Sequence, residues 1–367
     1  MEKAKISSIQ FFTFICLFEL GTAIVVVPGL SAKKDAWLAI LLGMIGGLFL
    51  FLLYALLFRL YPGFSLTGYA RQILGPPIGK LIGILYMFYF LYDGTRDVRD
   101  FGNLLTDSTY IYTPLLIINF MIILTIVYVL HHGIEVLART SEIFCGILFF
   151  IGFVAGIIII FSGQMDLNHL RPVLENGWGP VLKTAFPLTL TFPFGEVIVF
   201  AMLLPYLNRP KLGVKTGFAA IGLSGFLLMW TVSVDIGVLG INVASRSSFP
   251  LLASISLINL PGLFQRLDAL VVLTLIIGGF FKIAILYYGA VICAAETFNV
   301  ANFRKLLFPI AVVLLISSMT VATNFAEHIK EGLEFVPLYI HIPMQIGIPV
   351  VLLIAGFFRK KGQSAND

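Results

Sequence analysis

Long apolar runs recur along the whole chain, and each is about as long as a membrane span. A transmembrane helix needs about 20 predominantly apolar residues, because the hydrocarbon core of a bilayer is about 30 Å thick. Only 12% of the 367 residues are charged and 59% are hydrophobic, whereas a soluble domain carries about 25% charged residues. No polar stretch is long enough to build a water-facing domain. The sequence therefore predicts an all-α integral membrane protein.

Proline, glycine and charged residues divide the apolar sequence into ten predicted transmembrane helices. They are expected at about residues 8–30, 35–59, 78–105, 113–131, 134–161, 182–205, 211–239, 266–297, 303–323 and 336–358. Residues 64–75 and 325–335 are amphipathic, and residues 249–260 are apolar but too short to span, which favours a re-entrant or interfacial helix. The polar segment 162–181 is predicted to be an outer loop within a single transmembrane domain, residues 1–367.

The distribution of lysine and arginine predicts that both termini lie in the cytoplasm. With the N-terminus inside, the inner segments hold more of these residues than the outer ones, as inner loops generally do. Ten spans also return the chain to the side on which it began. The net charge of +5 is therefore interpreted as a topology signal and not as a nucleic-acid surface. Cys16, Cys145 and Cys293 each lie inside an apolar run and are expected to be packing residues.

Predicted helices one and six each contain a helix break beside a carboxylate. The stretch ICLFELGTA carries Glu19 and Gly21, and TFPFGEVIVF carries Gly195 and Glu196. Both carboxylates lie near the middle of their spans. Interrupted helices leave backbone N–H and C=O groups unpaired, and such groups persist in a membrane only where they line a cavity or bind a ligand. An ordinary kink explains either break alone, but the pairing of each break with an acid favours a site.

The two breaks are five helices apart, which predicts two inverted repeats of five helices. Repeat one would span about residues 8–161 and repeat two about residues 182–358. Such a repeat places helices one and six in equivalent positions, and broken helices at equivalent positions are the best indication of a substrate site in a transporter sequence. The N-terminal ends of half-helices carry partial positive charge, which suits a carboxylate on the ligand.

Lys282 lies in the middle of predicted helix eight, in the stretch GGFFKIAIL. A charged group at the bilayer centre costs roughly 2.5–3.5 kcal/mol on insertion scales. We therefore expect Lys282 to face the interior of the bundle and to pair with Glu19 or Glu196. A purely structural ion pair and a charge that serves the ligand are both consistent with this pattern.

The other polar side chains give weaker signals. Tyr92 and Tyr287 fall near the depth of the breaks and are candidate ligand contacts, whereas RDVRD at 96–100 is expected to form a solvated outer helix end. His131 and His132 sit at a predicted cytoplasmic turn, and nothing supplies a third metal ligand there. The sequence has no GxxxxGK[ST], HExxH or GxSxG motif. We expect no metal, no cofactor, no catalytic residues and no enzymatic activity.

Together, these features resemble the amino acid–polyamine–organocation superfamily, whose members have the LeuT-type fold. More narrowly, KISSIQFF, ELGTA with its following proline, KKDAWLAILLG, TFPFGE and the FFK of helix eight resemble the B subunit of spore germinant receptors over the whole chain. The resemblance implies a transporter-like subunit that binds a small nutrient, commonly an amino acid, in the inner membrane of the dormant spore. It also implies partner A and C subunits, and ion release on ligand binding.

Carried onto this sequence, the resemblance implies a pocket with contributions from helices one, three, six and eight. Together with Glu19, which the break itself indicates, its candidate residues are Gly21, Thr22, Tyr92, Phe194, Gly195, Glu196, Lys282, Ile283 and Tyr287. One departure is informative: some proton-coupled members of the superfamily carry a lysine on helix five, and here the buried lysine is on helix eight. Sodium or proton coupling is therefore not carried over.

Three functions remain open from the sequence. The first is a nutrient receptor subunit that passes a conformational change to its partners. The second is an amino-acid permease that completes a proton- or sodium-coupled transport cycle. The third is a conduit that passes water or ions and binds no nutrient. The fold alone does not separate them, because function depends on the site.

Overall fold

The computed structural model describes residues 4–257 and 268–363, in which the regular structure is helical apart from one isolated parallel bridge between Ile6 and Leu207. The helices of the first half of the chain are α1 (Ser8–Leu20), α2 (Ala23–Val26), η1 (Pro28–Asp35), α3 (Ala36–Leu60), α4 (Leu66–Leu74), α5 (Pro76–Ser108), α6 (Leu115–His131), α7 (Ile134–Phe161) and η2 (Leu167–Leu170). Those of the second half are α8 (Trp178–Lys183), η3 (Thr184–Thr189), η4 (Glu196–Met202), η5 (Leu204–Tyr206), α9 (Pro210–Leu239), α10 (Ile241–Ala244), α11 (Pro250–Ser256), α12 (Asp268–Thr297), α13 (Arg304–Thr320), α14 (Phe325–Glu334), η6 (Pro337–Gly347) and α15 (Ile348–Gln363).

Six helices of the described chain are long and apolar enough to cross a membrane, which makes this a multi-pass membrane protein. They are Ser8–Val26, Pro28–Leu60, Ile134–Phe161, Pro210–Leu239, Ala269–Thr297 and Pro337–Arg359. A seventh results if α13 and α14, bent by 103° at a short break, form one span. Helical segments lie in all ten predicted ranges, but a total of ten spans stays a prediction.

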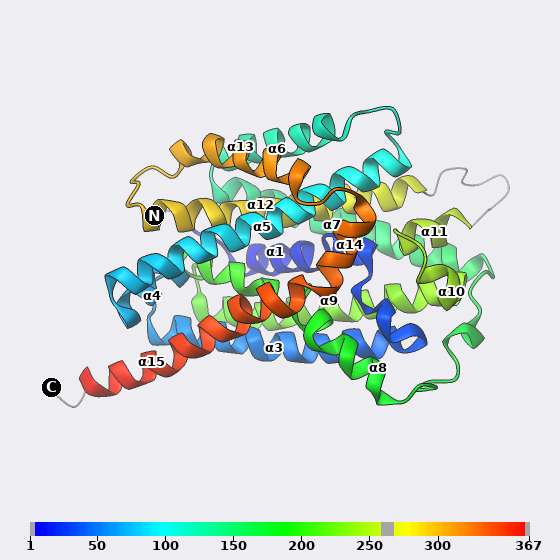
Figure 1. Ribbon diagram of the computed structural model, residues 1–367, viewed down its shortest axis with the longest axis horizontal. Helices are drawn as coiled ribbons and strands as arrows, with labels where there is room; N and C mark the ends of the chain where they lie inside the picture. The colour runs from blue at the N-terminus through cyan, green and yellow to red at the C-terminus, as the bar shows by residue number, and fades with distance from the viewer. Residues whose placement is uncertain (1–3, 258–267, 364–367) are drawn as a thin grey trace.

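The long helices run along the long axis of the molecule (Figure 1). α4 and the end of α15 lie at one end of this axis, and α8, α10 and α11 lie at the other (Figure 1). α1 lies inside the bundle, where it packs against α9, α7 and α12, while α12 also packs along α5. Residues 13–20 of α1 are all buried, so the first break occurs in the interior of the protein.

The three short segments predicted between spans are helical where the structure describes them. α4 and α14 coincide with the two amphipathic segments, and α11 falls within the short apolar segment at 249–260. Residues 258–260 of that segment, and the first two residues of predicted helix eight, lie outside the described residues. α14 folds back across the second half of α5, where Arg96 donates a hydrogen bond to the backbone carbonyl of His328.

Candidate substrate site

The first helix break lies between α1 and α2, at Gly21 and Thr22. Gly21 contacts the backbone of α12 closely, because a Cβ built on Gly278 would lie 2.9 Å from the Gly21 Cα atom. A Cβ on Gly21 would itself lie 2.9 Å from Cδ of Lys282. Glycine at both positions therefore lets α1 approach α12 at the depth of the lysine, as small residues do where membrane helices meet.

The second break lies between η3 and η4, where Pro193 and Gly195 interrupt the predicted sixth helix. Side chains from elsewhere bond the backbone that the break releases. The Gln345 amide donates to the Thr191 carbonyl at 3.1 Å, and the Tyr54 hydroxyl lies 3.5 Å from the Gly195 carbonyl oxygen. A Cβ at Gly195 would collide with the Gln345 side chain. The broken segment is therefore held by α3 and η6, as irregular backbone at membrane depth requires.

One buried amine connects the two breaks. The Lys282 Nζ atom lies 2.7 Å from Oε2 of Glu196 and 3.5 Å from Oδ1 of Asp97, and it donates a hydrogen bond to the Thr22 hydroxyl at 3.2 Å. Thr22 in turn donates to Asp97 at 2.8 Å. The predicted pairing of Lys282 with a helix-break carboxylate is confirmed, and the partner is Glu196. The Phe192 ring lies 4.5 Å from Nζ and adds a cation–π contact.

The prediction that RDVRD forms a solvated outer helix end is wrong. α5 continues to Ser108, and the charged residues of this stretch are at most 9% exposed. Asp97 faces Lys282 and Thr22, while His328 of α14 lies 2.9 Å from Asp100. The stretch is buried because α14 folds over it and supplies partners for its charges.

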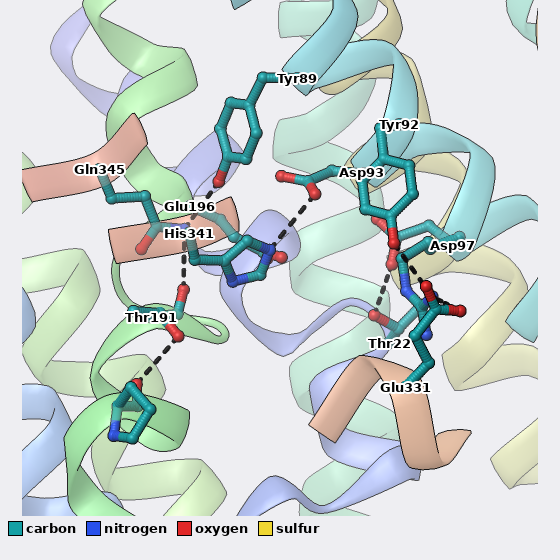
Figure 2. Close-up of polar contacts among 12 residues, drawn as sticks. Thr22, Tyr89, Tyr92, Asp93, Asp97, Thr191, Glu196, Glu331, His341 and Gln345 are labelled. Carbon is teal, nitrogen blue, oxygen red and sulfur yellow. Dashed lines mark hydrogen bonds and ion pairs between the residues drawn. The ribbon is translucent and has the colours of Figure 1, made fainter. Parts of the chain in front are cut away.

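Helix ten contributes a third irregular segment, η6, which has Pro343 inside it. His341 and Gln345, four residues apart, point toward α5 (Figure 2). The His341 Nε2 atom lies 3.3 Å from Oδ1 of Asp93, and Gln345 donates to the Tyr89 hydroxyl at 2.7 Å. η6 therefore completes a polar cluster with α5, η4 and the α1–α2 break.

A small cavity of about 40 Å³ lies beside this cluster. It is lined by Val26, Asp93, Arg96, Asp97, Asp100, Phe192, Glu196, Ile329, Gly332, Leu333, Val336 and His341. The cavity is therefore bounded by α2, by the second break, by α5, by η6 and by α14. A larger cavity, of about 780 Å³, lies elsewhere, between α4 and the end of α12.

The remaining predicted site residues are spread more widely. Glu19 is fully buried, and no described residue bonds either carboxylate oxygen. Phe194 and Ile283 are also fully buried. Tyr92 is half-buried and lies within hydrogen-bond distance of Arg96 (Figure 2). The Tyr287 hydroxyl donates to the backbone carbonyl of Leu307 in α13, so neither tyrosine bonds Lys282 or its carboxylate partners.

Sequence reasoning missed the polar face of α5 and the polar pair of η6. Asp93, Asp97 and Asp100 recur at i, i+4 and i+7, which places them on one helix face. His341 and Gln345 are likewise four residues apart, on either side of a proline. These spacings were the available signal, because polar residues that share one face of an apolar helix point toward a common partner.

Comparison with known proteins places the chain among germination proteins. The family described as "Spore germination protein" matches residues 5–326. Spore germination protein KB of Bacillus subtilis (strain 168) is 42% identical, and the match covers 98% of this chain and 97% of that protein. Spore germination protein YndE of the same organism is 25% identical over 98% of both chains.

The fold is similar to that of a transporter. Mhp1, a nucleobase-cation-symport-1 family transporter solved in a closed conformation with bromovinylhydantoin bound, matches with a TM-score of 0.65. The match covers 96% of this chain and 78% of Mhp1, at 15% sequence identity. At this identity the likeness concerns the fold alone.

Proposed function

The chain belongs to the spore germination protein family, and from that premise we propose that it is a membrane receptor subunit that binds a small nutrient at its two helix breaks. An amino acid is the ligand that the site suits best. The single observation that carries this proposal is the position of Lys282, whose amine joins the α1–α2 break to η4 through Thr22 and Glu196. The arrangement as two inverted repeats is part of the proposal, and the transporter-like fold supports it.

The charges around Lys282 suit a zwitterion. A ligand carboxylate would compete with Glu196 for the lysine amine, and a ligand ammonium would find Asp97 and Asp93 on the adjacent face of α5. Ion pairs and hydrogen bonds to charged groups contribute most where water is excluded. Glu196 and Asp97 are at most 5% exposed, so the site has that character.

Ligand binding there would also produce a signal. Lys282 currently holds three elements together: the α1–α2 break, α5 and η4. A ligand that takes over one of its partners changes which elements are joined, and a bistable packing of this kind is what an effector can bias. We propose that this change passes to A and C subunits in the spore inner membrane, with both termini of this chain in the cytoplasm.

The binding test uses the purified full chain and a panel of amino acids, including L-alanine, in a calorimetric or thermal-shift screen. Gly21→Leu drives a side chain against Lys282, and Gly195→Leu drives one against Gln345. We expect both variants to abolish saturable binding. Gly222→Leu is the matched control, because a Cβ at Gly222 meets no atom within 4 Å. Binding that survives both break variants would place the ligand elsewhere.

The alternative function is an amino-acid permease, which the likeness to a transporter fold favours. Uptake of labelled amino acid into proteoliposomes that contain this chain alone separates the two. Saturable binding without uptake supports the receptor, and accumulation in a proton or sodium gradient supports the permease. A conduit that binds no nutrient would show neither saturable binding nor uptake.

A further inference from the structure

The polar cluster contains a group of three metal-binding side chains that the proposed nutrient site does not use as a unit. Asp93 of α5, Glu196 of η4 and His341 of η6 each offer one ligand atom, and these atoms all lie within 4.8 Å of one another. All three side chains are buried and line the 40 Å³ cavity. Figure 2 shows Asp93 and His341 pointing toward one another, with Glu196 beside them.

We propose that Asp93, Glu196 and His341 form a binding site for one divalent transition-metal ion. Imidazole nitrogen combined with carboxylate oxygen suits ions such as Zn²⁺ and Mn²⁺, whereas Ca²⁺ and Mg²⁺ prefer oxygen ligands alone. The three ligands come from three different elements. The ion would therefore fasten η4 and η6 to α5, which is a role distinct from nutrient binding.

The charges around the cavity favour a cation. Four carboxylates line it, those of Asp93, Asp97, Asp100 and Glu196, against the single lining guanidinium of Arg96. Arg96 is also 3.6 Å from Glu331 (Figure 2), and Lys282 serves both Glu196 and Asp97. His328 lies 2.9 Å from Asp100, and two of the remaining carboxylates share one lysine. A positive occupant suits the cavity, because uncompensated charge is costly in a buried site.

Asp93 also has a carboxylate oxygen without a hydrogen-bond partner among the described residues. Asp93 is 4% exposed, its Oδ1 atom lies 3.3 Å from Nε2 of His341, and its Oδ2 atom is buried without a hydrogen-bond partner among the described residues. Buried carboxylate oxygens are normally paired. An ion in the adjacent cavity would supply the missing partner.

The size of the cavity fits a single ion. A water-sized occupant needs roughly 10–15 Å³, and the cavity provides about 40 Å³. Ligand atoms bonded to zinc at about 2.0–2.1 Å lie about 3.3 Å apart in a tetrahedral site, so a small rotation of these side chains closes the 4.8 Å spread.

The test measures metal binding by the purified full chain after treatment with a chelator. The protein carries His131→Gln and His132→Gln, because this exposed pair could bind zinc at the surface. Zn²⁺ and Mn²⁺ are the probes, and Ca²⁺ and Mg²⁺ are the comparison ions, in titration calorimetry with metal content measured after desalting. We expect one equivalent of Zn²⁺ or Mn²⁺ to bind and to raise the unfolding temperature.

Asp93→Asn and His341→Gln each alter one metal-coordinating side chain. We expect each to weaken metal binding at least about tenfold, because even the loss of a residue that only hydrogen-bonds to a coordinating side chain lowers metal affinity about 10–100-fold. The matched control is Asp235→Asn, which alters a buried carboxylate outside the cavity and should leave the affinity unchanged. Lys282→Met should tighten binding, because it removes a positive charge 2.7 Å from Glu196.

Three outcomes would overturn the site: no binding by the parent protein, equal binding of Ca²⁺, or an affinity that Asp93→Asn and His341→Gln leave unchanged. A ligand variant that unfolds is replaced by Asp93→Glu or His341→Asp, which keep a donor and should retain weakened binding.

Discussion

Replacing Lys282 with methionine tests whether its amine holds the two helix breaks together. Methionine keeps most of the side-chain volume but removes the amine that lies 2.7 Å from Glu196 and 3.5 Å from Asp97. Lys282 is fully buried, and the Glu196 side chain is 5% exposed, so water cannot replace the lost partner. Removing one partner of a buried ion pair costs about 3–5 kcal/mol, because the remaining charge is left uncompensated.

The assay is thermal unfolding of the purified protein in detergent. At about 2.1 cal/mol/K per residue, 367 residues give an unfolding entropy of about 0.8 kcal/mol/K. A loss of about 3–5 kcal/mol then lowers the unfolding temperature by about 4–6 °C. Lys215→Met is the matched control, since Lys215 is exposed on α9, and it should change the unfolding temperature by less than about 1 °C.

A double-mutant cycle with Glu196→Gln measures the coupling between Lys282 and Glu196. Glu196→Gln removes the carboxylate charge that Lys282→Met leaves without a partner. Lys282→Met should therefore cost at least about 1 kcal/mol less in the Glu196→Gln protein than in the parent protein. Part of the cost remains, because Asp97 still loses its positively charged partner. Two results would show that this ion pair does not hold the breaks together. One is that the stability losses of the two single variants add up in the double variant, and the other is that Lys282→Met is as stable as Lys215→Met.

Two further changes test the contacts that position the site. Gly278→Leu places a side chain against the backbone of Gly21. We expect thermal unfolding to show about 1–3 kcal/mol of destabilisation from overpacking, and calorimetry to show loss of amino-acid binding. Unaltered binding would mean that the site does not need this close approach. Tyr54→Phe removes the hydroxyl that donates to the backbone carbonyl of Gln345 at 2.7 Å. We expect about 0.5–1.5 kcal/mol of destabilisation in the same unfolding assay. An unchanged stability would mean that another group bonds that carbonyl.

The sequence predicted the parts of the site that are locally unusual. Glu19 and Glu196 are conspicuous because a carboxylate beside a glycine in an apolar run is costly unless it has a use. Lys282 is conspicuous for the same reason, and its burial and its pairing with a carboxylate beside a helix break followed from cost alone. The sequence did not show whether Lys282 would pair with Glu19 or with Glu196, because this depends on how α12 packs against α1 and η4.

The sequence did not predict contacts that depend on a distant segment. RDVRD resembles a solvated helix end because charges at the end of an apolar run normally meet water. In the structure α14, more than 200 residues later in the chain, folds back over it and pairs Arg96 with Glu331 and Asp100 with His328. Similarly, His341 and Gln345 look unremarkable until η6 lies against Asp93 and Tyr89 of α5.

Two predicted spans that carry part of the site do not stand out by length and apolarity, although Ser8–Val26 and Ala269–Thr297, which also carry it, do. α5 and the broken helix at 182–205 both fall within predicted spans, yet neither is among the six long apolar helices. α5 is excluded by the charged residues that face Lys282 and His341, and the sixth span is excluded by the break that presents Glu196. A ligand site in a bilayer needs charge and irregular backbone, and both lower the apolar signal that identifies a span. Charge and irregular backbone at the site therefore weaken the apolar signal of α5 and of residues 182–205, whereas α6, with 17 residues, and α13, bent against α14, stand outside the six because of length and bending.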